Sequence, residues 1–258
     1  MRIKEVPDLE KGFILKRSML LALSDAAILT NELLRKGYAD GILSGCELSV
    51  TEDTIVLNSG LIFLEQQIFM LKNSLSVSYK PTNITTLLKL CISGEVRDAD
   101  CVYREAELRL EASDELRSGE LEICRFKLQD GARLRCEYQD FEDRSTEYDT
   151  LNRIYTPCAA LDEPTLLPEI TKHFAREMLG YSDISEFDTL FCLQILGQRE
   201  AVTKEALVKY IEYKTKKQLD SHSNLRVYQE LRYILQQQTG SVERGTVKEK
   251  KAWRMMIE

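Results

Sequence analysis

The stretch GILSGCELSVTEDTIVLNSGLIFLEQQIFML, residues 41 to 71, consists of short apolar runs separated by glycines and polar turns. The polar triplet at residues 51–53 precedes TIVL, and Asn58-Ser59-Gly60 precedes LIFL. Asn and Gly tolerate the positive φ that tight hairpins require. The stretch therefore predicts short antiparallel strands that reverse at glycine-containing turns. Its glycines lead into strands, not into the helix that a phosphate-binding loop needs.

The same rhythm continues across residues 37–145. LSVSY at 75–79 and ARLRCEY at 132–138 alternate apolar with polar side chains, as half-buried strands do. Turn signals recur at hairpin spacing between such runs, which indicates roughly eight short strands. The region is predicted to be an antiparallel β-sandwich or small barrel, not a parallel βαβ sheet.

A helix is predicted at residues 14–36, where apolar side chains follow a 4-3-4-3-4 spacing that places them on one stripe. The stripe consists of Leu15, Met19, Ala22, Ala26, Leu29 and Leu33. Gly37 is expected to end the helix as a C-cap. So apolar a helix has to be covered. Packing on its own domain is the favoured interpretation, and packing against a neighbouring subunit is the alternative.

The helical period returns after residue 145, and four helices are predicted, within residues 162–180, 182–197, 202–219 and 223–240. The fold class is therefore α+β: an N-terminal helix, an antiparallel β-sandwich or small barrel, and a C-terminal four-helix α domain. The expected divisions are a docking helix at 1–36, an antiparallel β domain at 37–145, a helical domain at 146–240 and a C-terminal tail at 241–258.

The composition argues against several classes of protein. With 43% hydrophobic and 30% charged residues, the 258-residue chain is expected to fold. A formal net charge of −7 argues against a main role in holding nucleic acid, because that binding neutralises phosphates with Lys and Arg. The seven cysteines include no C-x-x-C pair and are interpreted as reduced core residues of a cytosolic protein. Neither a signal peptide nor a membrane span is expected, because Asp25 interrupts the N-terminal apolar run.

Candidate catalytic residues are few. The chain has two histidines, no G-x-S-x-G elbow and no glycine-rich nucleotide motif, so neither an enzyme nor a bound cofactor is expected. Glu169, His173 and Glu177 are the best metal candidates, because their i, i+4, i+8 spacing stacks them on one helix face. The favoured interpretation is a solvated face on which Lys172 and Arg176 balance the carboxylates, so no metal is expected.

Basic and aromatic residues interleave in the last two predicted helices, in a helix-loop-helix layout. This supports an alternative function, a cytosolic regulatory protein that binds nucleic acid through Lys214, Lys216 and Lys217 of the helical C-terminal domain. Tyr210 and Tyr228 lie beside apolar stripe positions, however, where core packing is favoured over base stacking. Nucleic-acid binding is therefore the second hypothesis.

Two parts of the β region resemble a known pattern. Gly41, Gly45 and Gly60 fall on the glycines of the β-module that opens many phage tail-fibre and baseplate proteins. Residues 121–145 are similar to the closing portion of the same modules, with Asp-Arg at 143–144 in the terminal position. The resemblance implies a structural part of a contractile or siphophage-like tail, a prophage tail or a tailocin, in which such modules pack against neighbouring subunits and carry the receptor-binding apparatus.

The chain departs from fibre proteins because a compact helical region follows the β region in place of a long trimeric shaft. This favours a non-enzymatic baseplate or fibre-adaptor subunit of a phage-tail-like particle. Its expected partners are other tail or baseplate subunits and a receptor-binding fibre, in a homo- or hetero-oligomer without nucleic acid or membrane insertion. It is expected in the cytoplasm of the producing bacterium and then in the assembled particle. The predicted interface residues are Leu15, Met19, Leu29, Leu33, Trp253, Met255 and Met256.

Overall fold

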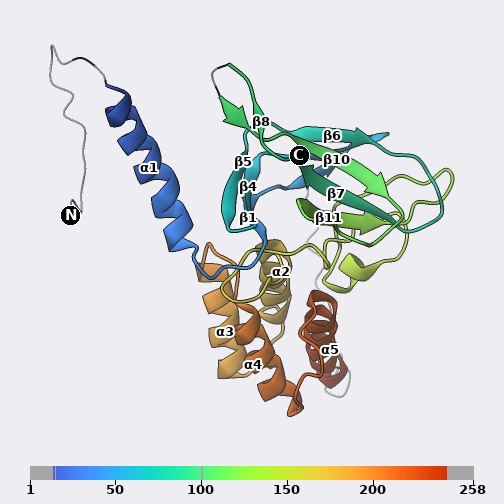
Figure 1. Cartoon of the computed structure of the whole chain (residues 1–258). Helices are drawn as coiled ribbons and strands as arrows, with labels where there is room; N and C mark the ends of the chain where they lie inside the picture. The colour runs from blue at the N-terminus through green and yellow to red at the C-terminus, as the bar shows by residue number, and fades with distance from the viewer. Residues whose placement is uncertain (1–13, 15, 100, 243–258) are drawn as a thin grey trace, which may run out of the picture.

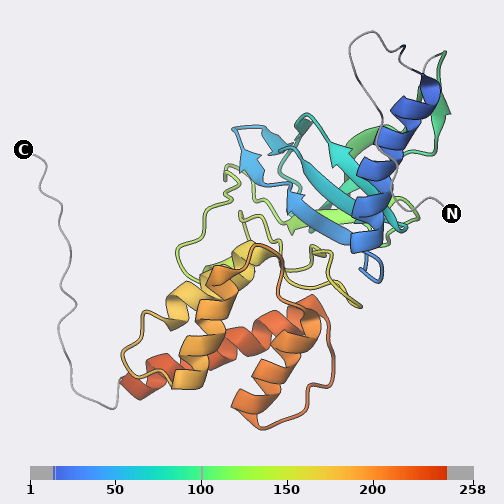
Figure 2. The same cartoon turned by 90° about the vertical axis from the view of Figure 1, so that its left-hand side faces the viewer.

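The computed structural model describes residue 14, residues 16–99 and residues 101–242. The β-sheets gather in one half of the molecule and helices α2 to α5 in the other (Figure 1). Helix α1 stands beside the sheets, and a quarter turn of the molecule shows the same division (Figure 2). The predicted combination of helices with antiparallel sheets is confirmed.

Eleven short strands among the described residues form three three-stranded sheets and one hairpin. The first sheet has the order β1-β4-β5, with bounds Gly41–Gly45, Gly60–Leu64 and Gln67–Leu71. The second has the order β2-β3-β6, with bounds Leu48–Val50, Thr54–Leu57 and Leu75–Ser78. The third has the order β10-β7-β11, with bounds Ala106–Glu111, Thr86–Ile92 and Glu120–Phe126. The hairpin pairs β8 with β9, with bounds Val96–Arg97 and Val102–Tyr103.

The barrel alternative is wrong, because none of these sheets closes on itself within the described residues. The strand predicted at 132–138 is also wrong. Its only β-pairing in the described part of the chain is a single bridge, in which the Arg135 N–H donates to Asp149 O at 3.0 Å and the Arg135 carbonyl accepts from Leu151 N at 3.0 Å. Alternation at this segment therefore reflects which side chains turn inward, not a strand.

The glycines of the opening stretch serve close packing more than chain reversal. Strand β1 lies against residues 157–159, where the Ile42 N–H donates to Pro157 O and the Ala159 N–H donates to Ile42 O, both at 2.9 Å. A Cβ at Gly41 would lie 2.6 Å from Ala159 N, closer than real contacts allow. The reversal between β4 and β5 instead uses Glu65 and Gln66, whose φ angles of 51° and 63° form a two-residue hairpin turn.

Each predicted helical segment contains a helix. Helix α1 spans Arg17–Leu34, and Gly37 follows it with φ +88°. The other four helices are α2 (Pro168–Met178), α3 (Glu186–Gly197), α4 (Lys204–Thr215) and α5 (Asn224–Val242). Local sequence explains their starts, since Pro168 occupies the first turn of α2 and the Ser185 hydroxyl accepts from Asp188 N at the start of α3.

Sheets and helices share one hydrophobic core. Phe141, just before the 3-10 turn η1 (Glu142–Ser145), packs its ring 4.7 Å from that of Tyr228 in α5 and 5.8 Å from that of Phe174 in α2. The Tyr228 hydroxyl donates to the Phe141 carbonyl at 2.5 Å. The predicted boundary at residues 145 and 146 therefore lies within a packed junction, and the division into domains stays a prediction.

Candidate interaction surface

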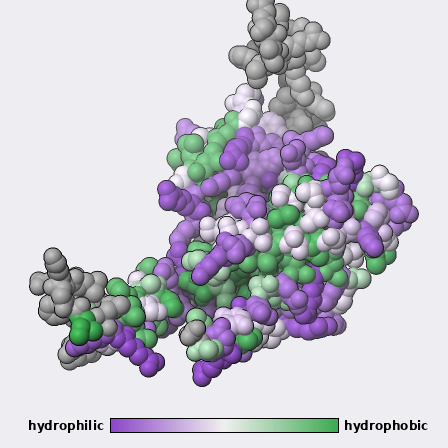
Figure 3. Space-filling view, turned by 90° about the horizontal axis from the view of Figure 1, so that it is seen from above, coloured by the Kyte–Doolittle hydropathy of each residue, from purple (hydrophilic) through white to green (hydrophobic). Residues whose placement is uncertain are grey.

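Helix α1 carries large apolar side chains that the rest of the described chain does not cover. None of its residues is buried, and Leu33 is 70% exposed. The expectation that this helix packs into its own domain is therefore wrong. Figure 3 shows hydrophobic residues on the arm that α1 forms beside the body. Exposed apolar surface of this kind marks interaction sites.

The body holds α1 along one side only. Arg35, just after the helix, pairs with Glu200 at 3.1 Å, and the Tyr38 hydroxyl bonds the same carboxylate at 3.4 Å. Ile28 also lines a concave pocket whose other walls come from strands β4, β5 and β9 and from the adjoining ends of β7 and β10. Both views place α1 beside these strands (Figures 1 and 2). The helix is thus fixed at its C-terminal end and stands off the sheet above it.

This pocket, which we call the α1 groove, has a volume of about 400 Å³. Its apolar lining includes Ile28, Phe69, Leu71 and Tyr103. Arg104 places its guanidinium 5.3 Å from the centre of the Phe69 ring, so the groove combines a charged side chain with an apolar lining. Such a combination is typical of protein contact surfaces.

The structure places only part of the predicted interface. Leu29 and Leu33 are exposed on α1, and Met19 is half-buried. Leu15 and the tail residues Trp253, Met255 and Met256 lie outside the described residues. The role of all these positions in an interface stays a prediction.

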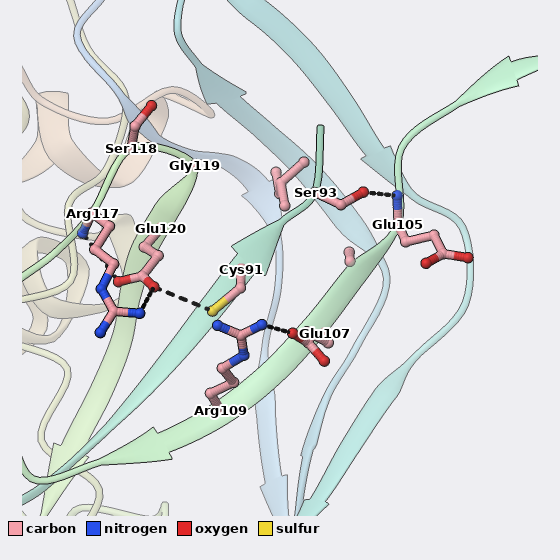
Figure 4. A pocket seen from close by; sticks show the side chains of 11 residues that line it. Cys91, Ser93, Glu105, Glu107, Arg109, Arg117, Ser118, Gly119 and Glu120 are labelled. Carbon is pink, nitrogen blue, oxygen red and sulfur yellow. Dashed lines mark hydrogen bonds and ion pairs between the residues drawn. The ribbon is translucent and has the colours of Figure 1, made fainter. Parts of the chain in front are cut away.

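A second concave region, of about 640 Å³, lies on the polar face of sheet β10-β7-β11 (Figure 4). Its charged side chains pair with one another: Arg109 with Glu107, and Arg117 with Glu120 at 3.9 Å. The Cys91 thiol lies 3.9 Å from the Glu120 carboxylate. Figure 4 shows Arg109 beside Glu107 and Arg117 beside Glu120, and with Glu105 the pocket is lined by three carboxylates and two guanidinium groups.

Next to this pocket lies Lys89, a charged residue of the central strand β7 that is fully buried. Its ammonium donates to Glu111 at 2.9 Å and to the carbonyl of Glu115 at 2.5 Å, and it lies 3.7 Å from Glu120. The hydrogen bond to Glu111 raises the pKa of Lys89. These contacts hold the segment that leads into β11 over the sheet, which is a structural role.

The proposed metal row on α2 is occupied by protein partners. Glu169 accepts from Arg153 at 3.1 Å and lies 3.6 Å from Arg144. His173 uses Nδ1 to accept a hydrogen bond from Arg144 Nε at 2.9 Å. Both arginines are buried and come from residues upstream of the helix. The row therefore binds the β half to the helical half of the molecule.

The third member of the row behaves in the same way. Glu177 accepts from the Phe141 N–H at 2.8 Å, and burial raises the pKa of its carboxyl. The interpretation of a solvated face balanced by Lys172 and Arg176 is wrong, because the partners come from outside the helix. Within the described residues, no group of three or more His, Cys, Asp or Glu side chains is placed to hold a metal ion.

The contact between His173 and Arg144 predicts a pH dependence of stability. His173 is held neutral because its Nδ1 accepts a hydrogen bond from a cation. Burial, and then the charge of Arg144, lower the pKa of His173 below 6.5. The unfolded chain therefore takes up the proton first as the pH falls, so this contribution to stability is complete above pH 6.5 and declines below it.

We expect the free energy of unfolding in urea to fall more between pH 7.5 and 5.5 for the wild type than for His173→Gln. The Gln side chain can accept from Arg144 but does not titrate. The nearby carboxylates Asp140 and Asp143 and the cation Arg176 are the same in both proteins, so they cancel in the comparison. Equal slopes for the two proteins would contradict the assignment.

The Asp-Arg pair that closes the β-module resemblance has two structural tasks. The Asp143 carboxylate accepts hydrogen bonds from both terminal nitrogens of Arg135, and this pairing holds the pKa of Asp143 well below its usual range. Arg144 points the other way, with its guanidinium 4.2 Å from the centre of the Tyr138 ring. The Tyr138 hydroxyl in turn donates to Leu151 O at 2.6 Å. The pair therefore fastens η1 to the loops on either side.

The cysteines are all free thiols, and five of the seven are buried. Burial raises the pKa of Cys46 to about 11 and the pKa of Cys124, Cys158 and Cys192 to about 12. These four thiols therefore stay protonated at neutral pH, and a protonated thiol is neither a nucleophile nor a metal ligand.

The candidate nucleic-acid lysines are partly engaged within the chain. Lys214 pairs with the buried Asp188 at 2.7 Å, and the Lys216 ammonium lies 4.0 Å from the centre of the Tyr213 ring. Tyr210 is buried and stacks on Phe191 with ring centres 3.9 Å apart. Of the three lysines, only Lys217 remains fully exposed without one of these contacts, which weakens the alternative function.

Sequence reasoning missed Lys204, in the first turn of α4. Its ammonium is buried and donates to the His222 carbonyl at 2.8 Å and to Asn224 Oδ1 at 2.6 Å. Asn224 then donates to Thr165 O at 3.0 Å. Burial lowers the pKa of Lys204 to about 8. A lysine at a helix start is usually solvated, so nothing in the local sequence indicates this link between α4, α5 and the loop before α2 that contains Thr165.

Comparisons with protein-family models and with curated proteins find no match for this chain. The similar solved structures include the crystal structure of TssK, with a TM-score of 0.39 and 9% identity over 91% of this chain and 69% of that chain. For the TssK-TssF-TssG baseplate subcomplex of the type VI secretion system, the TM-score is 0.40 and the sequence identity 8%, over 90% of this chain and 99% of that chain. For the baseplate complex from the type VI secretion system, the TM-score is 0.37 and the sequence identity 11%, over 91% of this chain and 100% of that chain. These structural neighbours are baseplate proteins, and at TM-scores below 0.5 the likeness carries no argument about this chain's function.

One further observation concerns membranes. Within residues 16–99 and 101–242, no helix combines the length and the apolar character needed to cross a bilayer.

Proposed function

We propose that this protein is a structural subunit of a phage-tail-like particle, a baseplate or fibre-adaptor component that acts through protein-protein contacts. The observation that carries the proposal is helix α1, whose 18 residues include no buried side chain although most of them are apolar. Covering one large aliphatic side chain contributes about 1.5–3 kcal/mol. A partner that covers several of them therefore gains a stable contact at no cost to the fold of the body.

The β region supports the choice of particle. The glycines that match the tail-module pattern include Gly41, Gly45 and Gly60, and in the structure each of them allows a close backbone approach. The Asp-Arg pair that closes the pattern fastens the junction between sheets and helices. The proposed partners are other tail or baseplate subunits and, through them, a receptor-binding fibre. The proposed location is the cytoplasm of the producing bacterium and then the assembled particle.

We also propose that the subunit has no catalytic activity. Support comes from the candidate groups themselves: Arg144 occupies the Nδ1 acceptor of His173, and burial keeps four thiols protonated. A histidine base or a thiolate nucleophile needs the group that is occupied here.

The proposal predicts that charge on the exposed stripe of α1 abolishes assembly but not folding. In the double variant Leu29→Glu and Leu33→Glu, two exposed apolar side chains become charged, so a partner would have to bury them at high cost. We expect the wild type to form complexes, alone or with partner subunits, in light scattering after size exclusion, and the variant to elute at the single-chain mass of 29.7 kDa.

The matched control is Ser24→Glu and Asn31→Glu, which adds the same charge on the other side of the same helix. We expect the control to assemble like the wild type, and both variants to keep the wild-type melting temperature within a few degrees. Equal masses for the wild type and the Leu29/Leu33 variant would count against α1 as the contact surface.

A further inference from the structure

Strand β5 is a free edge of the sheet β1-β4-β5. It pairs with β4 on one side and forms no ladder with any other strand of the described residues. The opposite edge of the same sheet, β1, already lies against residues 157–159. An edge strand presents unpaired N–H and C=O groups, which are a template for pairing with another chain.

The backbone groups of Ile68 and Met70 face this free edge. The two-residue turn after Leu64 makes Leu64 and Gln67 a hydrogen-bonded pair, and such pairs alternate with non-hydrogen-bonded pairs along an antiparallel ladder. Ile68 and Met70 therefore direct their N–H and C=O groups away from β4. No backbone hydrogen bond joins them to another segment of the described chain, so these groups are open to a partner.

Strand β5 lacks the features that keep other edges from pairing. Its sequence QIFML has no charged residue and no proline, and its register with β4 is regular. The edge strand β10 of the sheet β10-β7-β11, in contrast, carries Glu107, Arg109 and Glu111. Charges on an edge strand oppose pairing with another chain, whereas a regular apolar edge favours it.

The α1 groove runs along this edge. Phe69 and Met70 point to opposite faces of the sheet, because successive side chains of a strand alternate, and yet both line the groove. The groove therefore wraps round the edge of β5, with Ile28 of α1 on another wall (Figure 1). Met70 is 66% exposed and Ile28 is 54% exposed, so the groove is open.

We infer that an extended segment of another subunit of the particle adds to β5 as a further strand and lies in the α1 groove. This inference rests on the proposed function and names the form in which a partner binds. Both faces of β5 are apolar, with Phe69 and Leu71 on one and Ile68 and Met70 on the other. Side chains of neighbouring strands pack on the same face, so the added segment is uncharged and apolar on both of its faces.

A second copy of β5 is the poorer occupant of the groove. Helix α1 stands beside the same edge (Figures 1 and 2), so a second body would bring its own α1 against the first. A single extended segment brings no such helix with it.

Proline at residue 70 tests the backbone contact. Met70→Pro removes an N–H that points to the free edge and leaves the hydrogen bonds to β4 in place, so the variant should fold. Met70→Thr is the matched control, because it removes the same exposed side chain but keeps the N–H. We expect purified particles to contain at least about tenfold less of the Met70→Pro chain than of the wild type, and an amount of Met70→Thr within about twofold of the wild type. Equal losses for the two variants would show that the side chain is bound and not the backbone, which overturns the inference.

Hydrogen exchange of the wild-type chain is a second test that needs no substitution. The amides of Ile68 and Met70 are expected to exchange at least about tenfold more slowly in particles than in the isolated full chain. Equal exchange rates in particles that contain the chain would overturn the inference and leave the proposed function intact. Exchange that slows as the isolated chain is concentrated would assign the edge to a second copy, which also overturns it. Particles without the chain would contradict the proposed function, and the inference falls with it.

Discussion

Gly41→Ala is expected to destabilise the protein by about 3 kcal/mol, which is at the upper end of the usual loss when a methyl group is inserted where no space exists. The new Cβ would lie 2.6 Å from Ala159 N and 2.7 Å from the carbonyl oxygen of Pro157. Both atoms belong to backbone that is fixed by hydrogen bonds to Ile42, so no flexible side chain can move away. Urea unfolding of the purified protein measures the loss.

Gly94→Ala is the matched control. No heavy atom of the described residues, apart from its own chain neighbours, lies within 4 Å of a Cβ built there. The same chemical change should therefore alter stability by no more than about 0.5 kcal/mol. If both variants lose the same stability, close packing at Gly41 is not the reason for a glycine there.

Arg153→Met is expected to cost about 3 kcal/mol, because it removes one partner of a buried charged network. Arg153 is buried and donates to Cys46 O at 3.0 Å and to the Glu169 carboxylate at 3.1 Å. Methionine preserves much of the side-chain volume, so the loss reports the hydrogen bonds and the charge more than a cavity. In the variant, the carbonyl oxygen of the fully buried residue Cys46 loses the hydrogen bond that Arg153 donates to it.

The control applies the same substitution at the surface. Arg133 is 78% exposed and pairs with an equally exposed Glu52 at 3.0 Å. Arg133→Met should change the free energy of unfolding by less than about 0.5 kcal/mol, since exposed ion pairs contribute little. A loss for Arg153→Met no larger than that of the control would show that the two halves of the molecule do not depend on this residue.

Local patterns predicted much of the fold. The capping Ser185 and the apolar stripe of α5 placed helices correctly, and alternation identified β6 at Leu75–Ser78. The same alternation failed at 132–138, because it reports which side chains turn inward and not whether a neighbouring strand is present. A barrel was an open alternative for the same reason: strand count alone does not fix which edges meet.

The polar interior was not predictable from local sequence. Glu169 and His173 looked like a surface row on one helix, and their partners Arg144 and Arg153 lie 16 to 29 residues upstream. Lys89 and Lys204 likewise sit in segments where a lysine normally points to water. Such pairings depend on how distant segments pack, so they become visible only in three dimensions.

For helix α1 the sequence revealed the apolar surface but not its exposure. Its apolar stripe was plain in the sequence, and burial within the same domain was the natural expectation. The body instead contacts the helix near Ile28 and Arg35 and leaves Leu29 and Leu33 exposed. Sequence hydrophobicity identifies a surface that has to be covered, but it does not say whether the cover comes from the same chain.

The central claim is that this chain is a structural component of a tail-like particle, and the composition of that particle tests it most directly. Particles pelleted and purified from the cells that make this protein would be analysed by quantitative mass spectrometry. We predict that the chain is present in a fixed ratio to the other tail components, and that the Leu29→Glu and Leu33→Glu variant is lost from the particle while its level in the cell is unchanged. Purified particles that contain no copies of the wild-type chain would contradict the account.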